Sequence, residues 1–172
     1  KHLKNMTFEH AARTLDVMKH VLAKTGVDLK EKYASETFLT WDQVRALDRA
    51  GGEIGAHADR HWAMHERQSQ DFLHEQAQRS KERVESEIGS CRFFAYPFGQ
   101  REDIGRMAWE AVRDAGYEHA FTTIAGTLNA STNPWLLPRY GLAAEESNLA
   151  AFLPVLRANN ARLRTWQSQI GT

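Results

Sequence analysis

Apolar side chains recur along the chain at the three- and four-residue spacing of helices that have one buried face. The first such segment extends from about Thr7 to Lys24, and we expect a helix there. Its apolar positions are Phe8, Ala11, Ala12, Leu15, Met18 and Leu22. Gly26 is expected to end this helix, and residues 26–39 are expected to form a polar connection.

A second helix is expected from Thr40 to about Ala50. Thr40 and Gln43 have the spacing of a capping box, in which each side chain satisfies a free backbone N–H group of the first turn. Gly51 and Gly52 follow and should end the helix, because glycine readily adopts the backbone conformations that close a helix.

Further helices are expected in the second half of the chain. They cover about residues 69–88 and 103–115, with Asp103 as the N-cap residue of the latter. Their apolar faces comprise Leu73, Ala77, Val84 and Ile88 in the first and Ile104, Met107, Ala108, Ala111, Val112 and Ala115 in the second. The region from about Ser147 is also expected to be helical, with Pro154 splitting or kinking it.

Short apolar segments between these helices predict β-strands. They are Glu53–Ala56, Arg92–Ala95, His119–Ile124 and a short strand around Arg139–Leu142. The alternation of strands and helices predicts an α/β fold, in which crossover helices join parallel strands. In such folds the active site lies at the C-terminal ends of the strands. The segments His57–His61 and Tyr96–Gly99 both start where a strand is expected to end, which makes them candidates for chemistry.

The composition is that of a globular protein with balanced charge. The chain has 172 residues, of which 42% are hydrophobic, and it carries 22 basic and 22 acidic side chains. This length is enough for one domain with a substantial core. The zero formal net charge argues against nucleic-acid binding, and no segment has the apolar length of a membrane span. The single cysteine, Cys91, excludes an internal disulfide and a multi-cysteine zinc site.

His57 and His61 place two imidazoles four residues apart. Zinc accepts imidazole nitrogen at about 2.0–2.1 Å, and catalytic zinc sites commonly use three protein ligands and a water. Two histidines are therefore an incomplete site, and on spacing alone a pair that binds nothing is the alternative. Asp59 lies between them but is expected to point away or to cap a local turn.

Two segments with recognisable composition surround the expected strand ends. Residues 51–61 are Gly-Gly-Glu-Ile-Gly-Ala-His-Ala-Asp-Arg-His, and residues 94–99 are Phe-Ala-Tyr-Pro-Phe-Gly. The first resembles the second signature of the polysaccharide deacetylases of carbohydrate esterase family 4, and the other resembles their third. Segments that resemble the flanking parts of the family lie at 39–44, 115–123 and 137–139. The resemblance covers residues 38–142 in the family's order.

The resemblance implies a distorted (β/α) barrel of the polysaccharide deacetylase type, present here as an incomplete barrel. Residues 1–37 are then expected to be a helical N-terminal segment or insertion, and residues 38–172 the C-terminal part of the barrel. The resemblance also implies a divalent metal, usually zinc, held by one Asp and two His. Such an ion polarises an amide carbonyl and lowers the pKa of a water molecule.

By the same resemblance, His57 and His61 are expected to be metal ligands. The backbone N–H of Phe98 is expected to stabilise an oxyanion, with Pro97 fixing the turn that aims it. Tyr96 is expected to line the substrate groove.

The sequence also departs from the family. The first signature of the family, a strand ending in two aspartates, is not present; Asp16 and Asp28 lie in an expected helix and a connection. Ala58 stands where Ser or Thr is usual, and Ala95 stands where many members have an Arg that orients the base. We therefore expect the chain to be a fragment, or a companion chain to supply the missing N-terminal part of the barrel. No residue is assigned as catalytic base or acid.

Several other side chains receive plainer interpretations. Trp62, directly after His61, is expected to border the site and to contact substrate. His65 and His74 lie in polar surroundings and are expected to be solvated. Cys91 is expected to be a small buried residue rather than a nucleophile.

The expected function is metal-dependent hydrolysis of a C–N amide bond, namely N-deacetylation of an amino-sugar polymer or glycan. The alternative is a catalytically degenerate family member that binds a glycan or a protein. A third possibility is an enzyme of this fold that acts on another C–N bond, such as a cyclic amide. The expected partner is a carbohydrate substrate, and the resemblance alone favours a location outside the cytoplasm or at the cell envelope.

Overall fold

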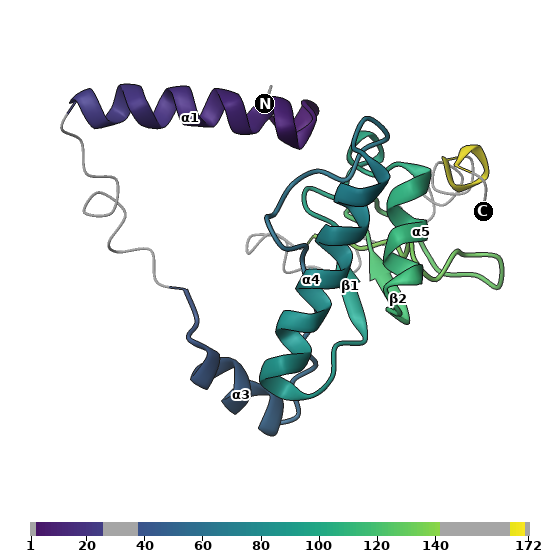
Figure 1. Ribbon diagram of the computed structural model, residues 1–172. Coiled ribbons are helices and arrows are strands. Elements are labelled where there is room, and N and C mark those ends of the chain that lie inside the picture. Colours follow the sequence, from purple (N-terminus) through teal and green to yellow (C-terminus); the bar gives the residue numbers. More distant parts are fainter. Residues whose placement is uncertain (1–2, 26–37, 142–165, 171–172) are drawn as a thin grey trace. The chain divides into compact units, whose positions relative to one another are not determined.

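The computed structural model describes residues 3–25, 38–141 and 166–170 (Figure 1). Two compact units are separable within the chain, Lys1–Ile54 and Gly55–Thr172. This division falls at a different place from the expected boundary between residues 37 and 38, which stays a prediction. The expectations for the connection at 26–37 and for the kink at Pro154 lie outside the described residues.

The first unit consists of helices in its described part. They are the 3-10 helix η1 (Leu3–Asn5) and the α-helices α1 (Phe8–Thr25) and α3 (Trp41–Arg49). Both predicted α-helices are confirmed. The capping box is confirmed as well, because the Thr40 N–H donates to Gln43 Oε1 at 2.8 Å and the Gln43 N–H donates to Thr40 Oγ1 at 3.3 Å. Gly51 follows with a φ of 89°, a conformation that favours glycine.

The second unit combines helices with parallel strands. Its elements are α4 (Gln70–Ile88), β1 (Phe93–Ala95), the 3-10 helix η2 (Arg101–Asp103), α5 (Arg106–Asp114) and β2 (His119–Phe121). Helices α4 and α5 pack against each other, and α5 also contacts β2 (Figure 1). Helix α4 begins after Ser69, whose hydroxyl accepts the N–H of Phe72 at 3.3 Å, and it ends at Gly89, which has a φ of 85°.

The strands are parallel, as predicted. Strand β1 pairs with β2 in a register that places Phe94 opposite Ala120. Isolated parallel bridges extend this pairing on both sides, from Ala56 to Phe94 and from Phe121 to Leu137. Four chain segments therefore lie side by side in one direction, so that their C-terminal ends share one edge.

The predicted strands are shorter in the structure than the sequence indicates: β1 and β2 have three residues each, and the first and last predicted strands are replaced by isolated bridges. Of residues 53–56 only Ala56 pairs, and residues 139–141 contain no strand because the pairing occurs at Leu137 instead. Gly55 shows the close approach at this point: a Cβ atom there would lie 2.8 Å from the Phe93 carbonyl oxygen. Residues 53–56 therefore contact β1 closely at one residue pair, Ala56 with Phe94, and do not form a longer ladder with it.

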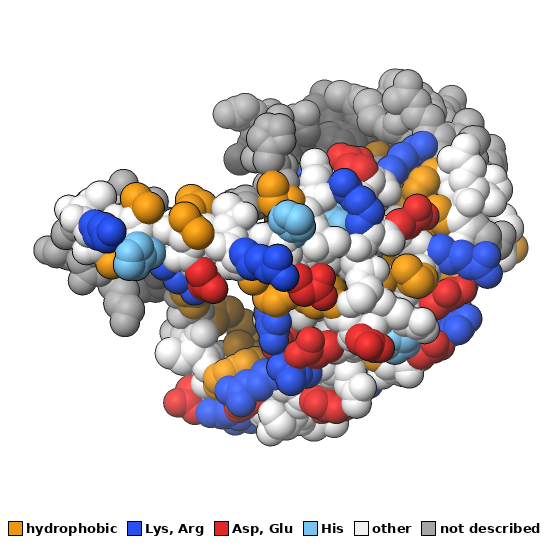
Figure 2. Space-filling view, turned by 45° about the horizontal axis from the view of Figure 1, so that its top comes forward, with side chains coloured by type: hydrophobic (Ala, Val, Ile, Leu, Met, Phe, Trp, Pro, Cys, Tyr) orange, Lys and Arg blue, Asp and Glu red, His pale blue; other side chains and the backbone are white. Residues whose placement is uncertain are grey.

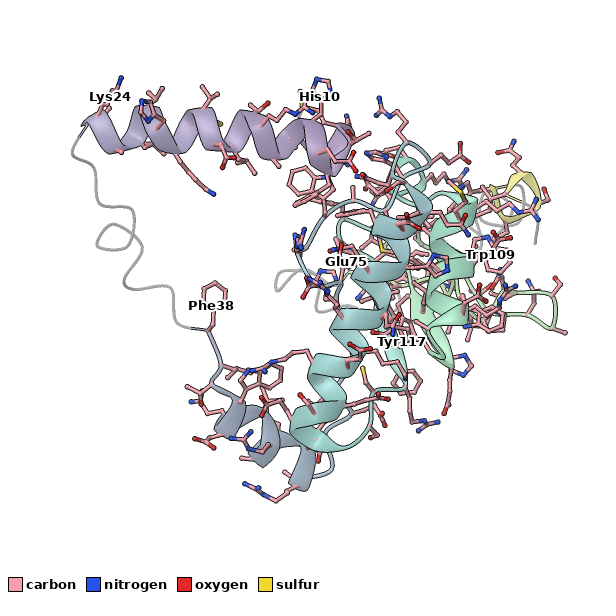
Figure 3. All side chains as sticks on the ribbon, viewed as in Figure 1. His10, Lys24, Phe38, Glu75, Trp109 and Tyr117 are labelled. Carbon is pink, nitrogen blue, oxygen red and sulfur yellow. The ribbon has the colours of Figure 1, made fainter. Side chains whose placement is uncertain are left out.

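A buried tyrosine hydroxyl connects α4 to the segment that enters β2. Tyr117 is buried, and its hydroxyl donates to the Ala77 carbonyl at 3.0 Å and lies 3.0 Å from Ser80 Oγ. Its ring packs at 5.1 Å from the ring of Phe94 on β1. Figure 3 labels Tyr117 together with Trp109, whose ring stacks on Trp135 at 6.2 Å. Aromatic contacts therefore fill much of the space between the helices and the strands.

The predicted N-cap of α5 is wrong. The helix begins at Arg106 after Gly105, whereas Asp103 is buried in η2 and accepts the N–H of Gln100 through Oδ2 at 3.2 Å. The cause is a parallel bridge between Ile104 and Met64, which draws the chain into an extended conformation before the helix can start.

The expectation that His65 is solvated is wrong. His65 is 4% exposed, and its Nδ1 accepts the N–H of Arg67 at 3.3 Å. It is buried together with Ala63 and Met64, because the bridge to Ile104 draws the loop into the core. His74, in contrast, is partly exposed on α4.

The surface carries mixed charge. Figure 2 shows Lys and Arg side chains interspersed with Asp and Glu rather than gathered by sign. On α4 this mixing takes the form of ion pairs four residues apart, such as Arg79 with Glu75 at 2.8 Å and Arg83 with Glu87 at 3.0 Å. None of the helices that the structure describes has the length and apolar character needed to cross a membrane.

We expect Tyr117→Phe to lower the free energy of unfolding by about 1–2 kcal/mol, because the change removes a buried hydroxyl that bonds to two groups of α4. Urea denaturation measures the difference. As a control, Glu118→Gln breaks an exposed ion pair with Arg92 and should change the stability little. Equal unfolding midpoints for Tyr117→Phe and the unaltered chain would contradict the role given to this hydroxyl.

The buried thiol gives a second prediction. Cys91 is buried as expected, and burial raises the pKa of its thiol. Because the thiolate is the reactive form, we expect Cys91 to react with a thiol reagent at pH 8 at least about tenfold more slowly in the folded chain than in urea. Above the ordinary thiol pKa the unfolded chain ionises first, so this group should lower the stability as the pH rises. Equal reaction rates in the folded and unfolded chain would refute the prediction.

Candidate functional site

His57 lies directly after the residue that pairs with β1. Its Nδ1 is 2.6 Å from the carbonyl oxygen of Ala95, the last residue of that strand. A carbonyl can only accept, so Nδ1 carries the proton, and in the neutral ring Nε2 then holds the lone pair. This is the arrangement in which a backbone carbonyl orients a histidine for metal binding.

The surroundings of His57 favour its neutral form. Burial of the ring is the main cause that lowers the pKa of His57, although part of the side chain stays exposed. The contact with Ala95 acts in the opposite direction, and the charges of His61 and Arg139 lower the pKa further. At neutral pH the ring is therefore available as a ligand or a hydrogen-bond acceptor.

His61 is brought back to His57 by a tight turn of the chain, residues 58–61, called the histidine loop below. The two ring centroids are 4.8 Å apart, with the ring planes at 70°. Ala58 has a φ of 62° and His61 a φ of 50°. Non-glycine residues adopt such values rarely, and only where the surrounding structure imposes them.

Helix α4 anchors the histidine loop through Arg60. The Arg60 backbone N–H donates to Gln76 Oε1 at 2.9 Å, and Arg60 Nη2 lies 3.3 Å from Oε1 of Glu75, which Figure 3 labels on α4. Gln76 was not predicted from the sequence, because a single polar position in a helix is unremarkable. The available signal was its place on the buried face, three residues after Leu73 and four before Ser80.

The turn after β1 forms a second wall beside His61. The Gly99 N–H donates to the Pro97 carbonyl at 2.7 Å and closes a three-residue turn around Phe98, whose φ is 62°. A γ-turn with a left-handed central residue is rare and strained. The Phe98 ring is 41% exposed and lies 5.2 Å from the ring of His61.

The chain after β2 holds this turn in place. Thr123 Oγ1 donates to the Phe98 carbonyl at 2.8 Å, and the Thr123 N–H donates to the Gly99 carbonyl at 2.9 Å. Only glycine fits at position 99, where φ is 71° and a Cβ atom would lie 2.9 Å from Thr123 N. Gln100 Nε2 adds a bond to Thr123 Oγ1 at 2.6 Å.

Tyr96 lies in the core and not at an open groove. Its side chain is 0% exposed, its ring packs 5.2 Å from that of Phe94, and its hydroxyl donates to the Trp135 carbonyl at 2.9 Å. Burial raises the pKa of this hydroxyl well above its ordinary value. The structure therefore places Tyr96 in the core, beside Phe94 and Trp135, and its expected role in lining a substrate groove stays a prediction.

The remaining predicted residues lie as follows. Pro97 is buried beneath the turn that it begins, and Trp62 is half-buried in the loop after His61. The structure thus brings together His57, His61 and Phe98. The roles of Trp62 toward substrate and of the Phe98 N–H toward an oxyanion stay predictions.

Arg139 is a charged residue at this edge that the sequence analysis did not single out. Its Nε donates to the Thr122 carbonyl at 2.7 Å, and its backbone N–H donates to the Ile124 carbonyl at 3.2 Å. These bonds fix the guanidinium beyond the end of β2. No local pattern identifies it, because its position depends on the pairing of Leu137 with Phe121.

Within residues 3–25, 38–141 and 166–170, no group of three or more His, Cys, Asp or Glu side chains is placed to hold a metal ion. Asp59 Oδ2 lies 3.6 Å from Arg60 Nε and does not complete a set with the histidines. The described site therefore offers two imidazoles, a strained turn and a nearby cation.

The chain is similar to one family of known proteins. A family model described as polysaccharide deacetylase matches residues 5–120, more than half of the chain. A search of curated protein sequences finds no match.

Several solved structures are similar. A de-N-acetylase from Aggregatibacter actinomycetemcomitans is 22% identical, with a TM-score of 0.52 over 69% of this chain and 53% of that one. The Streptococcus pyogenes deacetylase PplD, in complex with acetate, is 20% identical, with a TM-score of 0.56 over 64% of this chain and 48% of that one. IcaB from Ammonifex degensii is 21% identical, with a TM-score of 0.55 over 63% of this chain and 50% of that one.

The predicted fold class is confirmed. The chain spans about half the length of these structures, its described strands are parallel, and their sheet is not closed over the described residues. This is consistent with an incomplete (β/α) barrel. From the match to the family model, the chain belongs to the polysaccharide deacetylase family.

Proposed function

We propose that this chain supplies His57 and His61 as ligands of a divalent metal, with zinc expected, in a hydrolase that removes N-acetyl groups from an amino-sugar polymer or glycan. The observation that carries the proposal is the bond from His57 Nδ1 to the Ala95 carbonyl, 2.6 Å long. It leaves the lone pair on Nε2, and the His61 ring lies within 4.8 Å. Membership of the deacetylase family supports the reaction class.

The donor set fits part of a zinc site. Neutral imidazoles suit zinc, whereas catalytic sites commonly have three protein ligands. The proposal therefore includes a third ligand from outside the described residues, either from another part of the same polypeptide or from a companion chain. An ion held there would polarise the acetyl carbonyl and lower the pKa of the attacking water.

The chain's own residues have separate roles in this proposal. The Phe98 N–H, held by the γ-turn, would donate to the oxygen on which negative charge develops during attack on the acetyl group. Burial is the main cause that lowers the pKa of His57, and the positive charge of Arg139 adds a smaller effect in the same direction, which favours the neutral ring that binds as a ligand. Pro97 and Thr123 act on the reaction only by holding the Phe98 backbone in place.

A second function is favoured by one observation. Among the described residues no Asp or Glu joins the two histidines in a set that could hold a metal ion, and a deacetylase needs a base to activate water. A catalytically degenerate member that binds a glycan or a protein would need neither a base nor a metal. Metal binding and acetate release together separate the two functions.

The first test is metal binding by the intact polypeptide, together with any companion chain that supplies the third ligand. We expect calorimetry to detect one Zn²⁺ per chain, and His57→Ala or His61→Ala to weaken binding by about 100-fold or more, because each removes one of few ligands. His74→Ala is the matched control, since His74 is partly exposed on α4 away from the pair and should bind as the unaltered chain does. Equal binding by all four proteins, or no binding by the unaltered chain, would count against the metal site.

The second test is acetate release from N-acetylglucosamine oligomers. We expect the intact polypeptide, supplied with Zn²⁺, to release acetate, and His57→Ala to release at least about 100-fold less, because loss of a ligand removes the activating ion. If the intact polypeptide binds Zn²⁺ and the oligomer but releases no acetate, the degenerate binding function replaces the enzymatic one. Hydrolysis of a cyclic amide, with no acetate released from the oligomers, would retain the C–N hydrolysis and assign a different substrate.

A further inference from the structure

Gln76 of helix α4 is a fully buried polar residue that reaches the histidine loop. Its side chain is 0% exposed, and its Oε1 accepts the backbone N–H of Arg60 at 2.9 Å. Arg60 immediately precedes His61. The contact therefore joins the inner face of α4 to the backbone of the loop, one residue before a proposed ligand.

The orientation of the amide is determined by this contact. Because the Arg60 N–H is a donor, the oxygen of Gln76 must face it, and the amide nitrogen must point elsewhere. Nε2 of Gln76 is buried and has no hydrogen-bond partner within the described part of the chain. An unpaired buried donor lowers stability, so an apolar side chain of similar size would suit this position better if packing were its only purpose.

The backbone conformation of the histidine loop requires contacts from outside the loop to stabilise it. Ala58 and His61 both have positive φ values, which local preferences oppose. The other contact with α4, from Arg60 Nη2 to Glu75 at 3.3 Å, is between partly exposed side chains and constrains the backbone little. The buried bond to Gln76 acts on the backbone itself.

We propose that Gln76 is a positioning residue: its buried amide oxygen holds the Arg60 N–H and thereby fixes the backbone that presents His61 to His57. The effect of Gln76 on the loop backbone follows from its bond to the Arg60 N–H and from the positive φ values of Ala58 and His61. Its effect on metal affinity rests on the proposed function.

The test compares two substitutions at Gln76 with a control in the full chain. Gln76→Met keeps the size and removes the acceptor, and Gln76→Glu keeps an acceptor oxygen. Glu75→Gln alters the partly exposed ion pairs of Glu75 with Arg60 and with Arg79 and leaves the buried bond in place. Amide hydrogen exchange at Arg60 and nuclear Overhauser contacts between the rings of His57 and His61 report on the loop. Zn²⁺ affinity reports on the site.

For Gln76→Met we expect at least about tenfold faster exchange at Arg60, weakened ring contacts, and a loss of Zn²⁺ affinity of about 10- to 100-fold, the range typical of residues that orient ligands. Its thermal midpoint should not fall, because the unpaired donor is also removed. Gln76→Glu and Glu75→Gln should behave as the unaltered chain does at Arg60. A purely structural role would lower the thermal midpoint and leave the relative exchange at Arg60 unchanged.

A folded Gln76→Met protein with unchanged Arg60 exchange and ring contacts would overturn the proposal. So would an unprotected Arg60 N–H in the unaltered chain. If Gln76→Met does not fold, Gln76→Glu decides: retained protection at Arg60 supports the proposal, and lost protection overturns it. If the loop responds as expected but the unaltered chain binds no Zn²⁺, the proposed metal function fails while the positioning role stands.

Discussion

The backbone pairing of Ala56 with β1 is the constraint on which the rest of the site depends. The Ala56 N–H donates to the Phe93 carbonyl at 2.9 Å, and the Ala95 N–H donates back to the Ala56 carbonyl at 2.8 Å. The next side chain, His57, then returns to the Ala95 carbonyl, so one short stretch of strand places the ring and selects its tautomer. The pairing itself requires Gly55, since any side chain there would press on β1. The position of His57 thus depends on a backbone contact that only glycine permits.

At the C-terminal edge of the strands, residues with unfavourable backbone conformations are held by contacts from other parts of the chain. Positive φ values occur at Ala58, His61 and Phe98, and among the described non-glycine residues they occur nowhere else. The unfavourable conformations are maintained by contacts from distant parts of the chain: α4 holds the histidine loop, and the segment after β2 holds the turn at Phe98. Such over-determined loops are typical of sites that must keep a fixed geometry before a ligand arrives.

The parts of the fold that were predictable from sequence are those that depend on local signals. Helix α3 follows from a capping box that its first turn satisfies by itself, and the parallel strands follow from the alternation of elements. The start of α5 was not predictable, because the bridge between Met64 and Ile104 overrides a good N-cap residue. The histidine pair was found through its resemblance to a signature. Gln76 was not, since its partner is a backbone N–H sixteen residues away.

In the turn at Phe98 the backbone is held by hydrogen bonds, whereas the Phe98 side chain is partly exposed. Pro97, Gly99 and Thr123 hold the backbone through bonds that do not involve the Phe98 side chain, and that side chain is partly exposed beside His61. Substitutions at position 98 can therefore change the shape and polarity presented to an approaching molecule while the peptide groups stay where they are. The residue at position 98 can thus differ between related sequences at little cost to the turn, because the bonds that hold the turn run through the backbone and through Thr123.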